Sequence, residues 1–449
     1  MHRFDDRTAA LTEEIFDYLR WRLSVDPVML DHPATRAELD EVSPSLINDE
    51  GNDPSTVLAR FTDVLAPRVL STDSPRFLSF IPAAPTKASM LFDAVVSASS
   101  LNGTSWLEAA GAIHAENQVL RWIADLAGLP PGAGGCFLSG GSAGNLSALV
   151  VARDTARRGG LARTTRPRIL ASDQAHSSIS NTANLIDADV VAVPTIDDRL
   201  TGDAVARILA EDPDPSSIVA VVATAGTTNA GIVDDLEGVG RVANDAGIWF
   251  HVDGAYGAAG LLAPSVRNRF AGIERADSMI VDPHKWLFAP FDCAALIYRE
   301  PRLARAVHTQ DASYLDSIHE HDDWNPTDYA YHLTRRARGL AIWFSLSVHG
   351  TAAYREAVES SVTLARSTAQ LIEAMPHLEL VRRPDLSIVM FRRVGWDHDE
   401  YEAWSDRLLE SGVGLVLPSR WHGESILRFA FLHPGTTIEM VEEILDSLA

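Results

Sequence analysis

The segment Ile248-Trp-Phe-His-Val-Asp-Gly-Ala-Tyr256 decides the fold. Its first part, Ile248 to Val252, is a short apolar run of the kind found in strands that are buried on both faces. Asp253 follows directly, so a carboxylate stands at the carboxyl end of the predicted strand. Ligands of open α/β sheets bind at that end. Asp253 therefore either caps a helix or pairs with a bound group.

The same pattern recurs on both sides of this segment. Between about residues 75 and 335, short apolar runs alternate with stretches of helical periodicity. The other runs are Ile169 to Ala171, Val190 to Val193, Ile218 to Ala223, Met279 to Val281 and Cys293 to Tyr298. This alternation predicts an α/β fold with a mostly parallel central sheet and helices on both of its faces.

Three domains are predicted. Residues 1–74 form a helical segment whose apolar faces cannot be covered within the segment, so it is expected to serve dimerisation. Residues 75–340 form the large domain. Residues 341–449 form a small α+β domain with predicted strands at Leu386 to Phe391, Gly414 to Leu417 and Ile426 to Phe431, followed by a helix from Ile438.

Composition narrows the class of protein. The 449 residues include 38 Lys and Arg against 61 Asp and Glu, a formal charge of −23 that disfavours nucleic acid and anionic membranes as partners. Two cysteines provide neither a disulfide framework nor a metal-ligand cluster. The sequence shows no signal peptide and no run of 18 apolar residues, which predicts a cytoplasmic protein.

Glycines mark a candidate anion site in Phe137-Leu-Ser-Gly-Gly-Ser-Ala-Gly-Asn145. An apolar entry, a glycine turn and a following helical pattern place free backbone N–H groups at a helix N-terminus, which favours an anion. The segment matches neither the dinucleotide fingerprint nor the P-loop. Such turns are also common without any ligand, so this segment alone is a weak signal.

Two further segments carry basic side chains. Asp282-Pro-His-Lys-Trp286 follows an apolar run, and a lysine among apolar neighbours suits Schiff-base chemistry, because only the neutral amine attacks an aldehyde. Ser172-Asp-Gln-Ala-His-Ser-Ser178 also follows an apolar run. Read alone, His176 is an ordinary histidine.

Taken together, the four segments resemble the group II pyridoxal-phosphate-dependent decarboxylases, which act on aromatic amino acids, glutamate or diaminobutyrate. The resemblance extends from about Pro75 to Pro434. It implies a fold-type-I enzyme, pyridoxal 5'-phosphate as cofactor, and decarboxylation of a free L-amino acid to the amine through an internal aldimine on Lys285. It also implies a homodimer with active sites shared across the interface.

The resemblance assigns roles to single residues. Lys285 holds the cofactor, Asp253 pairs with the ring nitrogen, and Ala255 and His176 contact the two faces of the ring. The contacts to the phosphate fall on Gly141, Ser142, Thr228 and the backbone near His284. Asp282 stands where aromatic decarboxylases often have asparagine, and a carboxylate cannot donate a hydrogen bond to a phosphate.

The resemblance also implies residues that contact the substrate. Tyr314 corresponds to a tyrosine on a mobile loop that acts across the dimer interface and protonates the substrate carbon. Arg428 corresponds to an arginine that binds the substrate carboxylate. The implied pocket walls include Ile81, Pro82, Asn102 and Thr104. Because Asn102 and Thr104 are small and polar, the amino acid that this pocket accepts stays open between aromatic, aliphatic, acidic and sulfur-bearing types.

Two other functions remain open. The same scaffold supports decarboxylation-coupled oxidative deamination, which forms an aldehyde, or transamination. A non-catalytic binding protein on a decayed enzyme fold is more remote, since Lys285, Asp253, His176 and Tyr314 are all retained.

Overall fold

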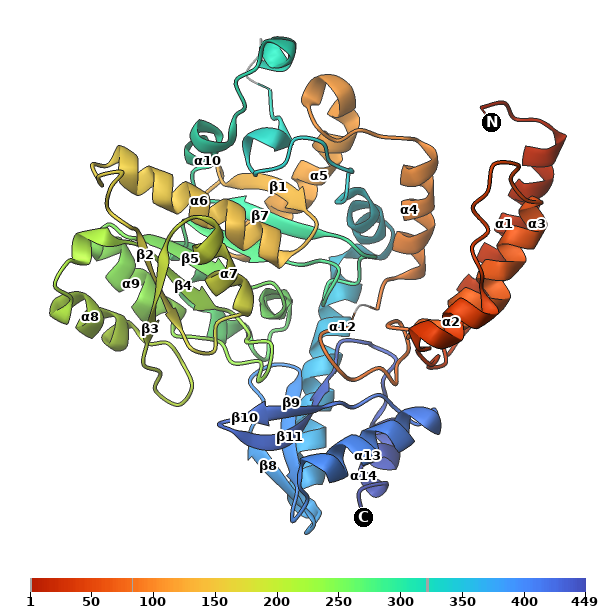
Figure 1. Ribbon diagram of the computed structural model, residues 1–449. Coiled ribbons are helices and arrows are strands. Elements are labelled where there is room, and N and C mark those ends of the chain that lie inside the picture. The colour runs from red at the N-terminus through yellow and green to blue at the C-terminus, as the bar shows by residue number, and fades with distance from the viewer. Residues whose placement is uncertain (1, 83, 320–322) are drawn as a thin grey trace.

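The computed structural model describes residues 2–82, 84–319 and 323–449. A large α/β body holds the central sheet, a smaller unit lies below it, and an N-terminal hairpin of helices stands at the side (Figure 1). The helix α12 (Leu340–Ala374) runs from the large body into the smaller unit.

Seven strands form the central sheet. In spatial order they are β1 (Gly134–Leu138), β7 (Ala294–Tyr298), β6 (Ser278–Val281), β5 (Trp249–Asp253), β4 (Ile218–Thr224), β2 (Arg168–Ser172) and β3 (Asp189–Val193). Only β7 runs antiparallel to its neighbours. The predicted, mostly parallel α/β sheet is confirmed.

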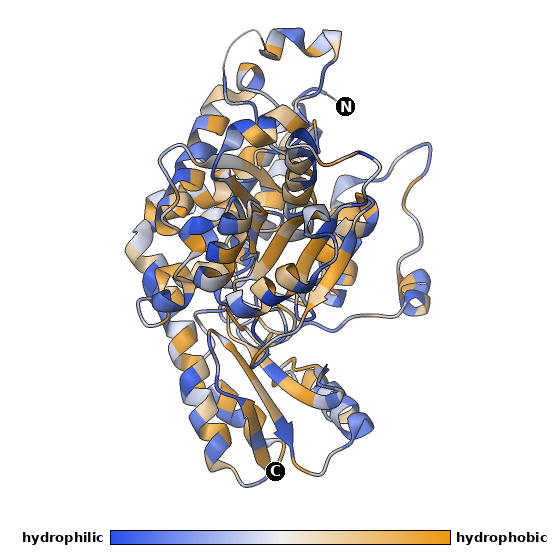
Figure 2. Ribbon diagram, turned by 90° about the vertical axis from the view of Figure 1, so that its left-hand side faces the viewer, coloured by the Kyte–Doolittle hydropathy of each residue, from blue (hydrophilic) through white to orange (hydrophobic). Residues whose placement is uncertain are grey.

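Helices cover both faces of this sheet, as the apolar strands require. One core contains residues of α6 (Gly141–Arg158), α7 (Ser177–Leu185) and α10 (Pro301–His308). The other contains residues of α5 (Trp106–Leu126), α8 (Gly202–Glu211), α9 (Leu236–Ala246) and α12. Hydrophobic residues accordingly concentrate in the strands between the two helical layers (Figure 2).

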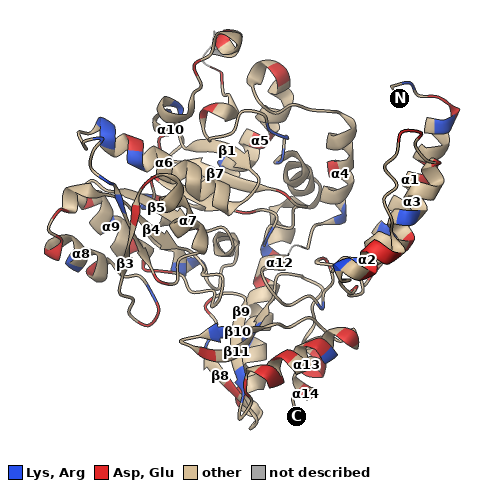
Figure 3. Cartoon of the chain, in the orientation of Figure 1, with Lys and Arg blue, Asp and Glu red and all other residues tan. Residues whose placement is uncertain are grey.

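The smaller unit is an antiparallel sheet in the order β10 (Pro418–Trp421), β11 (Glu424–Ala430), β9 (Ile388–Arg393) and β8 (Leu378–Arg382), packed with α13 (His398–Glu410) and α14 (Ile438–Asp446). Acidic side chains gather on these two helices (Figure 3). The strand predicted at Gly414–Leu417 is wrong. Leu415 instead pairs its backbone with Arg76 and Leu78, and the strand begins at Pro418.

The N-terminal hairpin is helical, as predicted. It comprises α1 (Asp6–Ser24), α2 (Arg36–Val42) and α3 (Pro54–Ala59), which continues as a π-helical turn. None of the described residues in these helices is buried, and their large apolar side chains Phe16, Trp21 and Phe61 remain about half exposed.

The remaining α-helices in the described part of the chain are α4 (Lys87–Ala98) and the single turn α11 (Asp316–His319). None of the described helices combines the length and apolar character needed to cross a membrane.

A buried ion pair joins three separate segments of the large body. Arg335 Nη2 donates to both carboxylate oxygens of Glu116 on α5, at 2.6 and 2.7 Å, and Arg335 Nη1 donates to Gly103 O at 2.8 Å. The N–H of Gly339, just before α12, donates to the same carboxylate. Both charged side chains are almost fully buried.

Glu116→Ala should lower the free energy of unfolding by about 3–5 kcal/mol, because it leaves the Arg335 guanidinium buried without its counter-charge. Urea denaturation of the apoprotein measures this loss. The matched control is Asp17→Ala, which breaks a pair with Arg20 that is mostly exposed and should cost under about 1 kcal/mol. Equal losses in both variants would contradict the prediction.

Candidate active site

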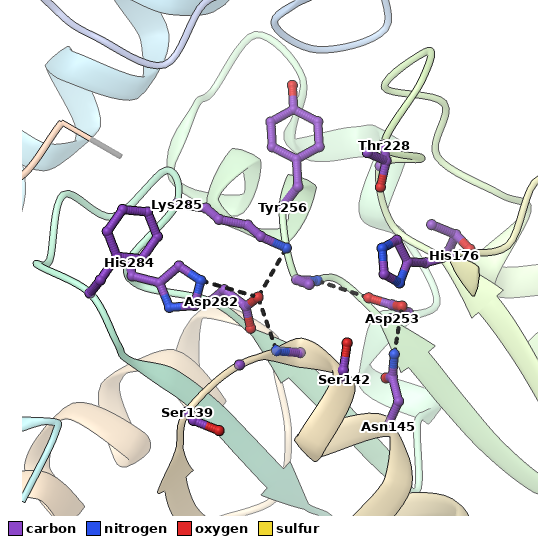
Figure 4. Close-up of a pocket in the computed structure, with 16 residues that line it drawn as sticks. Ser139, Ser142, Asn145, His176, Thr228, Asp253, Tyr256, Asp282, His284 and Lys285 are labelled. Carbon is purple, nitrogen blue, oxygen red and sulfur yellow. Dashed lines mark hydrogen bonds and ion pairs between the residues drawn. The ribbon is translucent and has the colours of Figure 1, made fainter. Parts of the chain in front are cut away.

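A cavity of about 260 Å³ lies at the carboxyl ends of the parallel strands. The residues predicted from the four sequence segments converge on it (Figure 4). Those that line it are Gly141, Ser142, His176, Thr228, Asp253, Ala255, His284 and Lys285. Segments that are far apart in the sequence therefore form one site, because the strands preceding them end at the same edge of the sheet.

The N-terminus of α6 opens into this cavity. Gly140 precedes the helix and provides no side-chain cap, so the first N–H groups need another acceptor. A Cβ atom on Gly141 would lie 3.0 Å from Ala255 Cβ and 3.1 Å from Asp282 Oδ2, which leaves no space for a larger residue. Backbone N–H groups and a helix dipole thus face a narrow space that suits an anion.

The Asp282 carboxylate already contacts this helix end. Its Oδ2 accepts from Gly141 N–H at 3.1 Å and lies 3.0 Å from Lys285 Nζ and 3.7 Å from His284 Nε2. Its Oδ1 is buried and has no hydrogen-bond partner in the described part of the chain. A carboxylate therefore lies where an anionic ligand would bind.

Asp253 is a second buried carboxylate, 5% exposed, at the end of β5. Its Oδ2 accepts from Asn145 Nδ2 at 2.9 Å and its Oδ1 from Ala255 N–H at 3.2 Å. Among the described residues it has no ion-pair partner within 4 Å, although a buried carboxylate is stabilised by a cation. The site thus offers a negative charge to a ligand that carries a positive one.

Two histidines on the cavity wall have defined proton positions. His176 Nδ1 accepts from the backbone N–H of Ser178 at 3.2 Å, and His284 Nδ1 accepts from Cys293 N–H at 3.0 Å. Each neutral ring therefore carries its proton on Nε2. Burial lowers the pKa of His284, which favours this neutral form.

Several lining residues were missed by the sequence analysis. They are Ser139, Gly140, Asn145, Thr224, Gly226, Tyr256 and Phe291. Thr224 pairs in register with Asp253 at the end of β4, so the rule that identified Asp253 also applies to it. Its Oγ1 is buried and lacks a hydrogen-bond partner among the described residues. Together with Asp282 Oδ1, this atom indicates space for a polar ligand.

Other predicted residues do not line the cavity of this single chain. Tyr314 lies on a short 3₁₀ turn (Ser313–Leu315) and is 71% exposed. Asn102 and Thr104 hydrogen-bond to one another at 2.5 Å, away from the cavity. Ile81 and Pro82 are also outside it.

Arg428 is outside the cavity lining but close to it. Its side chain is buried, Nη2 donates to Phe80 O at 2.7 Å, and Nη1 has no hydrogen-bond partner in the residues described. Burial lowers its pKa to about 10, and the nearby Tyr256, which lines the cavity, opposes that shift. A buried guanidinium with a free N–H group is suited to binding a carboxylate.

Fold and site together define a class: an α/β enzyme with a lysine amine, a buried carboxylate and an anion-binding helix end around one cavity. Pyridoxal phosphate has a group to match each of these features, namely an aldehyde, a ring nitrogen and a phosphate. The orphaned Thr224 Oγ1 and Asp282 Oδ1 are also consistent with a polar ligand.

Comparison with known proteins agrees with this class. Residues 37–394 match the pyridoxal-dependent decarboxylase conserved domain. Aromatic-L-amino-acid decarboxylase of Bacillus atrophaeus is 28% identical over 93% of this chain and 88% of that protein. 3,4-Dihydroxyphenylacetaldehyde synthase of Aedes aegypti is 29% identical over 87% of this chain and 79% of that protein. The crystal structure of Oryza sativa TDC with PLP and tryptamine superimposes with a TM-score of 0.90 at 26% identity, covering 100% of this chain and 99% of that one.

The chain therefore belongs to the pyridoxal-dependent decarboxylase family. It is a carboxy-lyase of amino acids with the fold-type-I architecture, and its cofactor is pyridoxal 5'-phosphate. The family resemblance inferred from the sequence is confirmed.

Asp282→Asn should tighten the binding of pyridoxamine 5'-phosphate by about tenfold or more, because it removes a negative charge beside the phosphate and adds an N–H donor. Isothermal titration of the apoenzyme measures the effect. This ligand has no aldehyde, so the reaction with Lys285 does not enter. Pyridoxamine, which lacks the phosphate, should bind both proteins equally.

Asp292→Asn is the matched control, since this carboxylate pairs with Arg338 and does not line the cavity. Unchanged or weaker binding of the phosphorylated ligand by Asp282→Asn would contradict the prediction.

Proposed function

We propose that Lys285 carries the cofactor in this enzyme and that the reaction converts a free L-amino acid into the corresponding amine. The observation that carries the proposal is the convergence of Lys285, Asp253 and the N-terminus of α6 on one cavity. When bound, the cofactor supplies an electron sink for the charge that develops at the substrate Cα.

In this proposal each part of the cavity holds one part of the cofactor. The phosphate binds at the start of α6, through Gly141 and Ser142, with Thr228 and the backbone near His284 as further contacts. Asp253 faces the ring nitrogen and keeps it protonated. Ala255 and His176 contact the opposite faces of the ring.

Arg428 is proposed to bind the substrate carboxylate. Its buried guanidinium has an unpartnered Nη1 and no ion pair among the described residues, and it lies near Tyr256 of the cavity wall. By fixing the orientation of the substrate carboxylate, Arg428 would select the bond to that carboxylate for cleavage.

A homodimer with shared active sites is part of the proposal. The described N-terminal helices bury none of their residues, and Trp21 and Phe61 present apolar surface to solvent. A second copy of the chain is a partner that covers such a surface symmetrically. We assign this role to residues 1–74, cofactor binding to residues 75–340, and the small domain to residues 341–449.

Tyr314 is proposed to reach the active site of the partner subunit and to protonate the substrate Cα. Its exposure and its place outside the cavity of its own chain support a role across an interface. Asn102, Thr104, Ile81 and Pro82 would then belong to the substrate pocket of the assembled dimer.

The cytoplasm is the proposed location, supported by two buried free cysteines, which suit a reducing compartment.

Aldehyde formation is the second candidate function. It is favoured by the similarity to the Aedes aegypti protein named 3,4-dihydroxyphenylacetaldehyde synthase. The retained pair of Tyr314 and His176 favours the amine. Measuring amine, aldehyde and oxygen consumption for the unmodified enzyme distinguishes the two reactions.

Lys285→Ala should abolish turnover and remove the cofactor label that borohydride fixes to the wild-type chain, because only a primary amine forms that reducible bond. Mass spectrometry of the reduced protein locates the label. Lys87→Ala, which changes a lysine at the start of α4 outside the cavity, is the control and should keep the label. A label retained in the Lys285 variant would assign the cofactor to another lysine.

Tyr314→Phe should retain at least part of the CO₂ release and lower the yield of amine, since the tyrosine proton is needed only after the carboxylate has left. Under air, aldehyde, ammonia and peroxide should replace the amine, whereas under nitrogen they should not. Quantifying all products in both atmospheres measures this shift. Tyr331→Phe serves as the control, because Tyr331 is also an exposed tyrosine.

Mixing two variants that are each defective in amine synthesis tests whether Tyr314 acts across the interface. A Lys285→Ala chain combined with a Tyr314→Phe chain should regain amine synthesis in mixed dimers, which contain one site with both native residues. No recovery in mixed dimers that have been isolated would place Tyr314 in its own subunit's site.

A further inference from the structure

The Asp253 carboxylate belongs to a network of buried hydrogen bonds that runs behind the cavity. Asn145 Nδ2 lies 2.9 Å from both Asp253 Oδ2 and Ser178 Oγ, and Asn145 Oδ1 lies 2.8 Å from His251 Nε2. Asn145 is 1% exposed and His251 is fully buried. One carboxamide group therefore holds partners from β5 and from α7.

The direction of each bond follows from what each group is able to donate. Ionised Asp253 only accepts, so the amide nitrogen of Asn145 faces it and the amide oxygen faces the Nε2–H of His251. On the other side of that ring, Ser278 Oγ accepts from Trp249 Nε1 at 2.8 Å and is free to donate to His251 Nδ1 at 2.8 Å. Burial lowers the pKa of His251 to about 4, so its ring is neutral at physiological pH.

A second branch reaches His176. Ser178 Oγ accepts one N–H of Asn145, which leaves its hydroxyl proton for His176 Nδ1 at 2.9 Å. The backbone N–H of Ser178 donates to the same Nδ1. Two donors on Nδ1 fix the proton of neutral His176 on Nε2, the nitrogen that is free to contact a ligand.

We propose that Asn145 is a positioning residue for the cofactor ring, orienting Asp253 directly and fixing the tautomer of His176 through Ser178. The inference rests on the proposed placement of the ring between Asp253 and His176. Figure 4 shows the geometry, with Asn145 below Asp253 and His176 on the other side of that carboxylate.

Without the carboxamide, Asp253 Oδ2 loses its only side-chain donor in the described chain, and the bond from Ala255 N–H to Oδ1 is left to orient the carboxylate. The carboxylate is then less firmly oriented toward a ring nitrogen. A ligand without that nitrogen should be insensitive to this change. This difference separates positioning from a general role in packing.

The test compares two ligands of the apoenzyme, pyridoxal phosphate and its carbocyclic analogue, in which CH replaces the ring nitrogen. Wild-type protein should prefer pyridoxal phosphate, and Asn145→Ala should reduce this preference about tenfold, as expected for one hydrogen bond to a charged group. Quenching of tryptophan fluorescence gives both dissociation constants. The control is Ser147→Ala, a buried serine on the same helix that does not line the cavity.

Each outcome has a separate meaning. If Asn145→Ala weakens both ligands by the same factor, Asn145 acts only in packing and the inference is wrong. If the wild-type protein shows no preference, Asp253 does not face the ring nitrogen, which overturns the proposed placement itself and the inference with it.

Ser178→Ala tests the second branch without disturbing the bond between Asn145 and Asp253. ¹⁵N NMR of histidine-labelled apoenzyme, with the His176 signal assigned from His176→Gln, should show a smaller fraction of the Nε2–H form, because of the two donors on Nδ1 only the backbone N–H of residue 178 remains. Ser178→Thr, which keeps the hydroxyl, should restore it. An unchanged signal in Ser178→Ala would overturn the branch to His176, and this variant keeps the inference testable if Asn145→Ala does not fold.

Discussion

A carboxylate buried at the carboxyl end of β5 constrains the rest of the site. Asp253 is held by Asn145 and by the backbone of Ala255, and the described chain supplies it with no cation. A buried charge of this kind is costly unless hydrogen bonds or a counter-charge compensate it, and a cationic group of a ligand would supply that counter-charge. The parallel sheet makes this arrangement possible, because β4, β5 and the strands beside them end at one edge where several polar residues meet.

The charged groups at the α6 end of the cavity have partners within the chain. Asp282 contacts both the start of α6 and Lys285, so the lysine and the helix end each have a partner before any ligand arrives. The same carboxylate would repel a phosphate, because both groups are negatively charged. Binding of the cofactor must therefore rearrange this corner of the cavity, whereas the corner at Asp253 is already in place.

Much of the central sheet and of the cofactor site was predictable from the sequence. Apolar strands followed by polar residues located Asp253 and Lys285, since a parallel sheet brings strand ends together whatever their order in the chain. Thr224 obeys the same rule, because it directly follows the apolar run Ile218 to Ala223 and ends β4. Asn145 was not predictable in its role, because its three partners lie on two other elements, Asp253 and His251 on β5 and Ser178 on α7, and no local pattern reports such contacts. Leu415 was assigned to a strand of the small sheet for a similar reason: its backbone partner, Phe77, is distant in sequence.

The two halves of the proposed site differ in how firmly they are held. Gly141, Asp253 and Ala255, assigned to the cofactor, are buried at the start of α6 and the end of β5, where packing and hydrogen bonds leave little freedom. Arg428, assigned to the substrate, is buried on β11, whereas Tyr314 and Asn102 are exposed in the single chain. Substitutions at such positions cost little stability. The cofactor chemistry is therefore expected to be the constant part of this fold, and the choice of substrate and the fate of the product to depend on the exposed segments.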